Sequence, residues 1–324
     1  MVGTPRVSFE HQTVLADEVI EALTPRSGGV YCDGTLGGGG HLARLLAVPG
    51  TRGIGIDRDP AALSAAAERL PADRVRLVHA TYASLPEILG DTKVDGIVLD
   101  LGVSSPQLDH ADRGFSFTKT GPLDMRMDPT RGPTARDLME ELTEDELADV
   151  IHELGEERHA RKIARLIKAG LEGIHTTTDL ATLVARAIPM IEQRKSKIHP
   201  ATRTFQALRI AVNQELDELA ALLARFPDLL APGGRCAIIS FHSLEDRLVK
   251  NAFRDLAWTT SLPPKLAREA GERVDPVVHV VTKKPIEASA AEVERNPRAR
   301  SAKLRVCERT SAPNVSGVEK KLAH

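Results

Sequence analysis

A run of glycines follows a short apolar stretch near the start of the chain. Residues 30–32 are apolar, Asp33 ends them, and residues 37–40 are all glycine, directly before a helix pattern that starts near His41. Glycine takes positive φ freely and lets the backbone approach a ligand closely, and a helix N-terminus offers unpaired N–H groups. Such a strand, turn and helix is typical of a site for a nucleotide-like ligand, with a plain tight turn as the alternative.

A second acidic residue points to the same kind of ligand. Asp57 ends the next apolar run, 20 residues after Gly37, where a carboxylate can accept hydrogen bonds from both ribose hydroxyls. The alternative role, a turn carboxylate, suits Asp59 better, because Asp59 precedes Pro60 and can cap a helix. The pattern D-G-T-L-G-G-G-G differs from the dinucleotide pattern G-x-G-x-x-G, so we predict S-adenosylmethionine rather than NAD.

A parallel sheet is needed to bring these residues together. Apolar β-type runs at 29–34, 52–57, 75–79 and 94–101 alternate with helix patterns, and strand character returns at 235–241, 277–282 and 302–308. The sequence predicts an α/β fold, a Rossmann-like S-adenosylmethionine-dependent methyltransferase sheet with an inserted all-helical domain. The predicted boundaries are 1–112 and 215–310 for the methyltransferase domain, 113–214 for the helical insertion and 311–324 for a flexible tail.

Local signals fix several expected elements. Residues 143–146 form a capping-box pattern, and residues 176–178 begin another apolar-periodic helix. Ala231-Pro232-Gly233-Gly234 predicts a turn before the strand at 235–241. Five apolar residues are spaced for one buried stripe on a single helix: Leu208, Val212, Leu216, Leu219 and Leu223.

Composition limits the classes of protein. The chain has 324 residues, 42% of them hydrophobic and 27% charged, and no uncharged apolar run approaches the roughly 18 residues of a spanning helix. We therefore expect a cytoplasmic protein without membrane contact. Cys32, Cys236 and Cys307 lie far apart in strand-like segments, which predicts reduced, buried thiols and no metal site.

The net charge of −2 conceals an uneven distribution. Residues 137–157 contain ten carboxylates and no Lys or Arg, whereas residues 194–209 contain five Lys or Arg and no acid. A second basic cluster, at 295–309, has six Lys or Arg. Such runs are commonly solvated faces, but the two basic clusters can also supply phosphate contacts to a nucleic acid.

Long motifs in this sequence resemble one family. They occupy residues 33–35 with 38–41, 55–60, 100–109, 113–117, 123–127, 199–209, 240–247 and 296–305, in order, over about residues 10–309. The resemblance is to the RsmH (MraW) methyltransferases of small-subunit ribosomal RNA. It implies methyl transfer from S-adenosylmethionine to the N4 amine of a cytosine in the decoding region of 16S ribosomal RNA. The implied partner is that RNA, within an assembled or nearly assembled small subunit, and a homodimer is left open.

The resemblance and the residue patterns together give a set of candidate site residues. The cofactor set is Asp33, Gly38, Gly39, Gly40, His41, Asp57, Tyr82, Asp100 and Gln107. For Tyr82, a core aromatic is the alternative. The RNA set is Arg194, Lys195, Lys197, Arg203, Arg209, Arg298, Arg300 and Lys303. In the alternative, Arg203 and Arg209 brace the helical insertion against the sheet by pairing with its acids. Phe115, Phe117 and Phe241 could support an unstacked base, or belong to a core.

The catalytic candidates follow from the chemistry of a cytosine amine. Its lone pair is delocalised into the ring, so hydrogen-bond acceptors should hold the amine in line with the methyl group. The segment 100–106 lacks the Asn/Asp-Pro-Pro-aromatic motif of many amine methyltransferases, which leaves Ser104 and Ser105 as candidates. His242 could reach the same crevice, although a structural histidine is an equal alternative. The competing functions are a nicotinamide-dependent oxidoreductase and a non-catalytic RNA-binding assembly factor.

Overall fold

The computed structural model describes residues 13–258, 266, 269–270 and 275–314. The chain forms two compact units, one made of Met1–Gly102 with Asp217–His324 and one made of Val103–Leu216. The helical unit thus begins at 103, where sequence analysis placed the boundary at 113, and ends at 216, where it placed the boundary at 214. The predicted tail lies outside the described residues from 315 onward.

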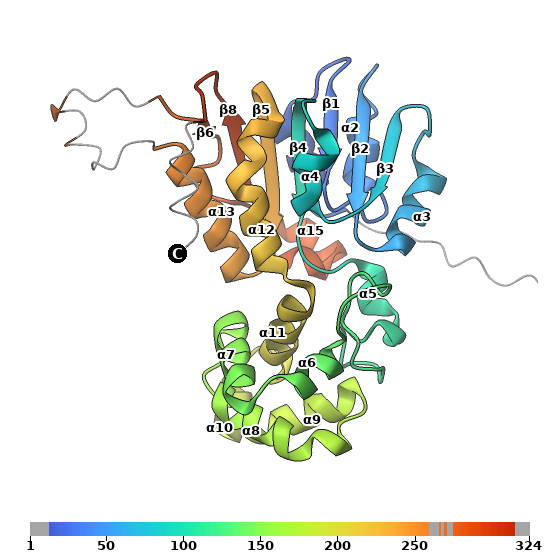
Figure 1. Cartoon of the computed structure of the whole chain (residues 1–324), viewed down its shortest axis with the longest axis vertical. Coiled ribbons are helices and arrows are strands. Elements are labelled where there is room, and N and C mark those ends of the chain that lie inside the picture. Colours follow the sequence, from blue (N-terminus) through green and yellow to red (C-terminus); the bar gives the residue numbers. More distant parts are fainter. Residues whose placement is uncertain (1–12, 259–265, 267–268, 271–274, 315–324) are drawn as a thin grey trace, which may run out of the picture. The chain divides into compact units, whose positions relative to one another are not determined.

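The first unit contains a mixed sheet whose order is β3-β2-β1-β4-β5-β8-β6 (Figure 1). Strands β1 to β5 pair in parallel, and β8 is antiparallel to both β5 and β6. The short β7 pairs, also antiparallel, with the first two residues of β8. An antiparallel strand at this position separates the sheet from the parallel dinucleotide-binding order 3-2-1-4-5-6. The strands are β1 (Val30–Asp33), β2 (Arg52–Asp57), β3 (Val75–His79), β4 (Val94–Asp100), β5 (Leu230–Ser240), β6 (Val278–Val280), β7 (Ile286–Glu287) and β8 (Lys303–Arg309).

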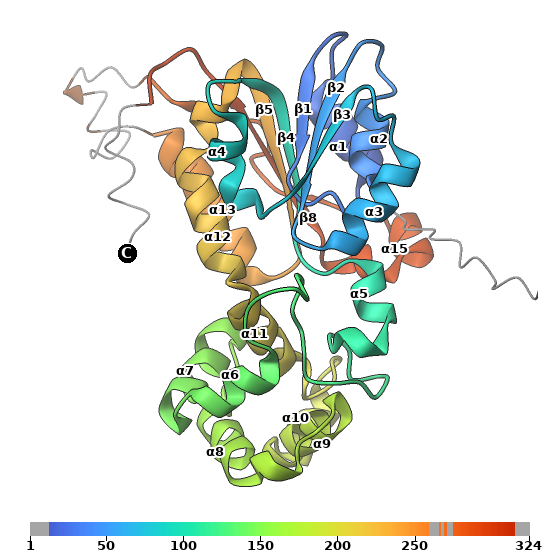
Figure 2. The ribbon, with the colours of Figure 1, turned by 45° about the vertical axis from the view of Figure 1, so that its right-hand side comes forward.

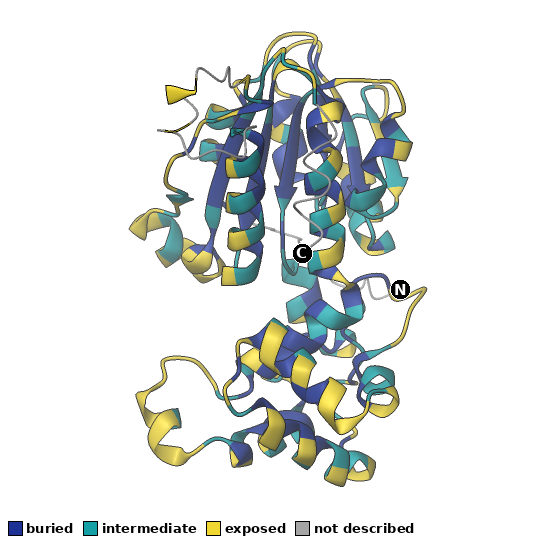
Figure 3. Cartoon of the chain, turned by 60° about the vertical axis from the view of Figure 1, so that its left-hand side comes forward, coloured by how far each residue is buried: buried dark blue, intermediate teal, exposed yellow. Residues whose placement is uncertain are grey.

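Helices cover both faces of this sheet because alternate strand residues are apolar on both sides. Helices α1, α2 and α3 lie on one face of the sheet, and α4, α12 and α13 on the other (Figure 2). Tyr31 and Val98 pack in the core of the first face, and Cys32 and Ile97 in the core of the second. The central strands are accordingly buried along most of their length (Figure 3). The helices are α1 (Ala16–Leu23), α2 (Gly40–Leu45), α3 (Pro60–Arg69), α4 (Leu85–Leu89), α12 (Glu215–Arg225), α13 (Ser243–Leu256) and α15 (Ala290–Arg295), with short 3₁₀ turns at Tyr82–Ser84, Phe226–Leu229 and Pro297–Ser301.

The second unit is helical and has its own apolar core. The capping box predicted at 143–146 is present, and the helix predicted at 176 begins with Thr176 as its N-cap. The acids of 137–157 have a partial explanation here, because Asp137 and Glu146 complete capping boxes at helix starts. The helices are α5 (Ser105–Asp109), α6 (Ala135–Glu141), α7 (Glu144–Gly155), α8 (Ala160–Gly170), α9 (Thr177–Ala187), α10 (Met190–Lys195) and α11 (Thr202–Asn213), with 3₁₀ turns at Ala111–Arg113 and Leu171–Gly173.

Two sequence predictions are wrong in detail. The stripe from Leu208 to Leu223 does not lie on one helix: α11 ends at Asn213, Gln214 takes a φ of 50°, and α12 begins at Glu215. Leu208 packs in the core of the helical unit, and Leu223 in that of the sheet unit. The turn predicted at 231–234 lies inside β5, as an irregularity where the pairing shifts from Val94 with Leu230 to Gly96 with Arg235.

The prediction of reduced, buried thiols is confirmed. All three thiols are free and buried. Burial in the sheet core raises the thiol pKa of each, so none is activated toward oxidation or metal binding. Across the described residues, we find no helix with the length and apolar character that a membrane span requires.

Candidate functional site

The site lies at the carboxyl ends of β1 and β4, which are neighbours in the sheet. The chain runs outward from β1 to β2 and β3 on one side, and from β4 to β5 on the other, so the strand order reverses between β1 and β4. Ligands of open α/β sheets bind at this switch point. Asp33 is the last residue of β1, Asp100 is the last residue of β4, and His41 follows the glycine turn in α2.

Each of these three side chains has at least one buried polar atom without a hydrogen-bond partner among the described residues. Asp33 and His41 are buried, with 1% and 3% of their surfaces exposed. Asp33 Oδ2, Asp100 Oδ1 and both ring nitrogens of His41 are buried and form no hydrogen bond with any described residue. His41 Nε2 lies 3.6 Å from Asp100 Oδ2. Buried polar atoms are normally paired, so this cluster indicates a place for a polar ligand with hydrogen-bond donors.

The electrostatics of the cluster favour a cation. Burial is the main reason that the pKa of Asp33 rises from 3.8 to about 7; His41 and the Thr35 N–H oppose the rise, and Asp100 and Asp57 add to it. A cationic ammonium group beside Asp33 would favour the carboxylate and lower this pKa again. The amino-acid end of S-adenosylmethionine carries such a group.

Asp57 holds the glycine turn in place. Its Oδ2 accepts the Gly37 N–H at 2.7 Å and its Oδ1 accepts the Asp59 N–H at 2.8 Å. Gly37 and Gly39 have φ values of 49° and 74°, which other residues rarely adopt, and a Cβ on Gly40 would lie 1.9 Å from Thr13 Oγ1. The remaining lone pairs of Asp57 are suited to ribose hydroxyls. Asp59 caps α3 by accepting the Ala61 N–H, as predicted.

Thr35 is a residue that sequence analysis missed. Its Oγ1 accepts the Asp100 N–H at 2.6 Å, and its own N–H donates to Asp33 Oδ1 at 3.2 Å. Thr35 therefore connects the ends of β1 and β4. The D-G-T order in the sequence was a usable signal, because Thr follows the acid by two residues at a strand end. Tyr82 lies in the turn after β3 and is 7% exposed.

Ser104, Ser105 and Gln107 lie at the start of α5, in the helical unit, and Ser104 and Gln107 form the N-terminal cap of that helix. Ser104 Oγ accepts the Gln107 N–H at 3.4 Å, and Gln107 Oε1 accepts the Ser104 N–H at 2.9 Å. Ser104 therefore has a structural role, and the amide oxygen of Gln107 is engaged in the same box. Ser105, at the first position of the helix, forms no side-chain hydrogen bond with a described residue.

His242 is the N-cap of α13. Its Nδ1 accepts the Glu245 N–H at 3.5 Å, and its Nε2 lies 3.1 Å from Glu245 Oε1, outside hydrogen-bond geometry. Glu245 Oε2 also accepts the N–H groups of Phe241 and His242. This arrangement corresponds to the structural histidine that sequence analysis gave as the alternative.

The predicted RNA-binding cations differ in their surroundings. Arg194, Lys195 and Lys197 are exposed, and none has a side-chain partner among the described residues. Arg209, in contrast, forms a two-point ion pair with Glu215 at 2.8 and 2.9 Å. Glu215 begins α12 but falls, like Arg209, within Val103–Leu216, so this pair is not the predicted brace against the sheet. Arg203 donates to the Glu156 carbonyl. In the sheet unit, Arg298 and Arg300 are exposed, and Lys303 lies 3.8 Å from Asp246, which Arg305 also contacts.

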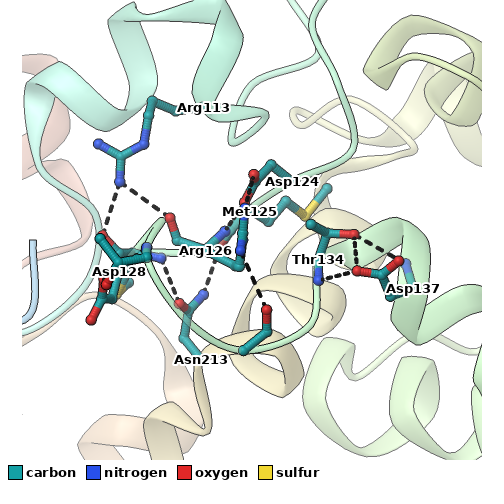
Figure 4. A network of polar contacts seen from close by, with 11 residues as sticks. Arg113, Asp124, Met125, Arg126, Asp128, Thr134, Asp137 and Asn213 are labelled. Carbon is teal, nitrogen blue, oxygen red and sulfur yellow. Dashed lines mark hydrogen bonds and ion pairs between the residues drawn. The ribbon is translucent and has the colours of Figure 1, made fainter.

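The motif at 123–127 forms a buried loop in the helical unit (Figure 4). Met125 is fully buried with a φ of 61°, a strained conformation for this residue. Asn213 holds the loop by donating to the Met125 carbonyl at 2.8 Å and accepting the Met127 N–H at 2.7 Å. Arg113 donates to the carbonyls of Arg126 and Met127. The role of Asn213 depends on contacts 86 and 88 residues apart, which no local pattern reveals.

The residues at the switch point fit S-adenosylmethionine. Asp33 and Asp100 offer unpaired buried acceptors to an ammonium group, Asp57 offers acceptors to the ribose, and the glycine turn leaves room for close approach. A mixed sheet of this order with this site defines a Rossmann-like, S-adenosylmethionine-dependent methyltransferase. The chain belongs to the MraW methylase family, which matches residues 8–310.

Individual relatives agree with this membership. The chain is 53% identical to a ribosomal RNA small subunit methyltransferase H of Myxococcus xanthus, over 303 residues that cover 93% of this chain and 98% of that protein. It is 52% identical to the protein of the same name from Anaeromyxobacter dehalogenans, with 93% and 98% coverage. The protein of that name from Synechococcus elongatus is 50% identical, with 93% and 95% coverage. The membership favours the methyltransferase prediction over a nicotinamide-dependent oxidoreductase.

The raised pKa of Asp33 predicts how cofactor affinity depends on pH. Binding of the ligand's ammonium group requires the carboxylate form of Asp33, so below about pH 7 one proton must leave Asp33 as the ligand binds. We expect the affinity for S-adenosylhomocysteine to fall about tenfold from about pH 7.5 to pH 6. Calorimetry in buffers of different ionisation enthalpy should detect proton release near pH 6. A flat affinity profile with no proton release would contradict the assignment.

In the cofactor-free protein, Asp33 has the opposite pH dependence: it favours the folded state more at low pH than at high pH. The folded-state pKa of Asp33 lies above its ordinary value, so its contribution to stability is complete below pH 3.8 and is lost as the pH rises through about 7. The cofactor-free protein should therefore gain more in melting temperature from the ligand at pH 7.5 than at pH 6. Asp33→Asn, which cannot ionise, should remove this difference.

Proposed function

We propose that this protein transfers a methyl group from S-adenosylmethionine to the exocyclic N4 amine of a cytosine in the decoding region of small-subunit ribosomal RNA. The observation that carries the proposal is the cluster of unpaired acceptors at the switch point, in a chain of the MraW methylase family. The names of its relatives supply the substrate class, ribosomal RNA of the small subunit. We further propose that the substrate is an assembled or nearly assembled small subunit.

The methyl transfer does not need a strong general base. S-adenosylmethionine supplies an electrophilic methyl group when bound. The amine becomes much more acidic once it is methylated, so its proton can leave to solvent after the transfer. What this chain must supply is alignment of the amine and exclusion of competing geometries, which can account for much of the rate. His242 is held by Glu245 and is not required as a base in this account.

The loop after β4 is the candidate for alignment. Asp100 ends the strand beside the cofactor residues, and the chain continues through Leu101, Gly102 and Val103 to the start of α5. Gly102 has a φ of 101°, which lets the chain turn sharply after the strand. Because the Ser104 hydroxyl is engaged in the cap, Ser105 is the serine left to accept a hydrogen bond from the amine.

The two serines provide a matched test. Ser105→Ala should lower turnover about tenfold, with cofactor affinity unchanged, because one hydrogen bond that positions the amine is lost. Ser104→Ala should instead lower stability by about 1 kcal/mol through loss of the helix cap. Turnover and urea denaturation of both variants separate these effects. Unchanged turnover in a folded Ser105→Ala protein would remove Ser105 from the mechanism.

The substrate is tested with labelled methyl donor. Purified small subunits, free ribosomal RNA and DNA are each incubated with the protein, and incorporated label is counted. We expect incorporation into RNA, highest with subunits. Incorporation only into DNA would contradict the substrate assignment. No incorporation into any substrate, with cofactor binding intact, would favour the non-catalytic assembly factor.

A further inference from the structure

The helical unit contains a groove that the proposed chemistry does not use. It has a volume of about 600 Å³, and the residues that line it come from α9, from α10 and from the segments that precede α6 and α11. Its lining includes Phe117, Ile188 and Met190 together with Gln193, and contains no acidic residue. Met190 and its neighbour Ile191 each expose 65% of their surface. A concave apolar site with a few polar groups and exposed apolar residues is typical of a binding site.

Phe, Trp and Tyr make up only 3% of this chain, yet Phe117 lines this groove, where its ring contacts that of His199. The centroids of Phe117 and His199 are 4.7 Å apart, with an angle of 33° between the ring planes. Phe205, which is buried, supports Phe117 in an edge-to-face contact at 4.9 Å. Phe117 therefore belongs only partly to the core, and its position is fixed before any ligand binds. A fixed ring at a surface groove is suited to stacking with a planar group.

Gln193 adds a polar group with a defined orientation. Its Nε2 donates to the carbonyls of Ala185 at 2.7 Å and Ile188 at 2.8 Å, so both amide N–H groups are engaged. The side chain can therefore offer a ligand only its oxygen, which is an acceptor. An exocyclic amine of a nucleobase is a matching donor.

Four cations belong to the segments that line this groove or follow them directly in the chain. Arg186 is part of its lining, and Arg194, Lys195 and Lys197 follow Gln193 along the chain. All four are exposed, and none has a side-chain partner among the residues that the structure describes. The acids nearest in sequence are engaged elsewhere: Glu192 with His159, and Asp179 in the cap of α9. Unpaired cations around an aromatic groove complement a polyanion with planar groups.

We propose that this groove binds an unstacked nucleobase of single-stranded RNA, with the neighbouring phosphates on Arg186, Arg194, Lys195 and Lys197. The inference rests on the proposed function, because it assigns this groove to the RNA substrate. Duplex RNA does not present a free base face, so the ligand is a single-stranded loop or linker. The base in this groove adds affinity and register; it is a separate contact from the amine that is methylated.

Binding of two oligonucleotides to the full-length protein tests the proposal. One probe is fluorescein-labelled oligocytidine of about 12 nucleotides, and the other is an abasic oligomer of the same length and charge. Phe117→Leu, which keeps apolar volume and removes the ring, should weaken oligocytidine binding about tenfold and leave abasic binding within about twofold. Phe117→Tyr should restore the oligocytidine affinity. Thermal melting of each variant confirms that it is folded.

Charge reversal gives a second, independent readout. Lys195→Glu should weaken binding of both probes and reduce the slope of log affinity against log salt by about 1. Arg52→Glu is the matched control, because Arg52 is exposed at the start of β2, at the opposite end of that strand from the cofactor residues, and should leave both affinities unchanged.

The outcomes separate the groove from the proposed function. An oligocytidine affinity unchanged by Phe117→Leu, or an equal loss with both probes, would overturn the groove proposal. Loss of subunit methylation by Phe117→Leu with unchanged oligonucleotide binding would also overturn it, because the groove would then contact a protein. If the wild-type protein fails to methylate small subunits while Phe117→Leu still loses only oligocytidine affinity, the proposed function fails and the base-binding groove stands.

Discussion

Asp57→Ala should lower the affinity for S-adenosylhomocysteine about 100-fold at pH 7.5. The carboxylate serves two purposes: it accepts the Gly37 and Asp59 N–H groups, and its other lone pairs are available to the ribose. Loss of two charge-assisted hydrogen bonds to the ligand corresponds to about 3 kcal/mol, or two orders of magnitude in affinity. The glycine turn would also lose the acceptor that fixes Gly37.

The neighbouring acid provides the control for this variant. Asp59→Ala removes a carboxylate two residues away that caps α3, and should lower stability by about 1 kcal/mol while cofactor affinity changes less than about threefold. Isothermal calorimetry on both proteins gives the comparison. An Asp57→Ala protein that binds as tightly as the wild type would show that the ribose is held elsewhere.

Asn213→Ala should lower the free energy of unfolding by about 3 kcal/mol. The substitution leaves two buried backbone groups, the Met125 carbonyl and the Met127 N–H, without their partner, and each such group costs about 1–3 kcal/mol. The loop already contains Met125 in a strained conformation, so it depends on this support. Urea denaturation followed by circular dichroism measures the change.

The next residue along the chain supplies a matched control. Gln214 is exposed and has a φ of 50°, so Gln214→Gly should change the free energy of unfolding by less than about 1 kcal/mol. A loss below 1 kcal/mol for Asn213→Ala would mean that the other contacts of the loop, among them the hydrogen bonds from Arg113, Ala135 and Arg136, are enough to hold it.

The features that sequence analysis predicted correctly depend on neighbouring residues. The Asp59 cap with Pro60 and the capping box at 143–146 each depend on residues within a four-residue segment. The parallel strands can be recognised as short apolar runs. Asp33 and Asp57 could be placed at strand ends for the same reason. Their assembly into one site then follows from the rule that parallel strands end at a common edge.

The features it missed depend on contacts that are distant in sequence or on a single backbone angle. The apolar spacing from Leu208 to Leu223 continues across the break at Gln214, because one left-handed residue ends a helix without changing the residue types around it. The Ser104 cap is an exception, because Ser104 and Gln107 are only three residues apart and form a local capping-box pattern. A hydroxyl near a strand end also suits catalysis, and sequence analysis gave Ser104 that role. The contact between Phe117 and His199 spans 82 residues and has no local signal.

The most direct test of the central claim identifies the methylated nucleoside. Small subunits are methylated by the purified protein with labelled S-adenosylmethionine, the ribosomal RNA is digested to nucleosides, and the label is located by chromatography and mass spectrometry. We expect the label to appear in N4-methylcytidine, and fragment mapping to place it in the decoding region. Label in a ring-methylated cytidine or in any other nucleoside would contradict the assignment of this protein as a cytosine N4 methyltransferase.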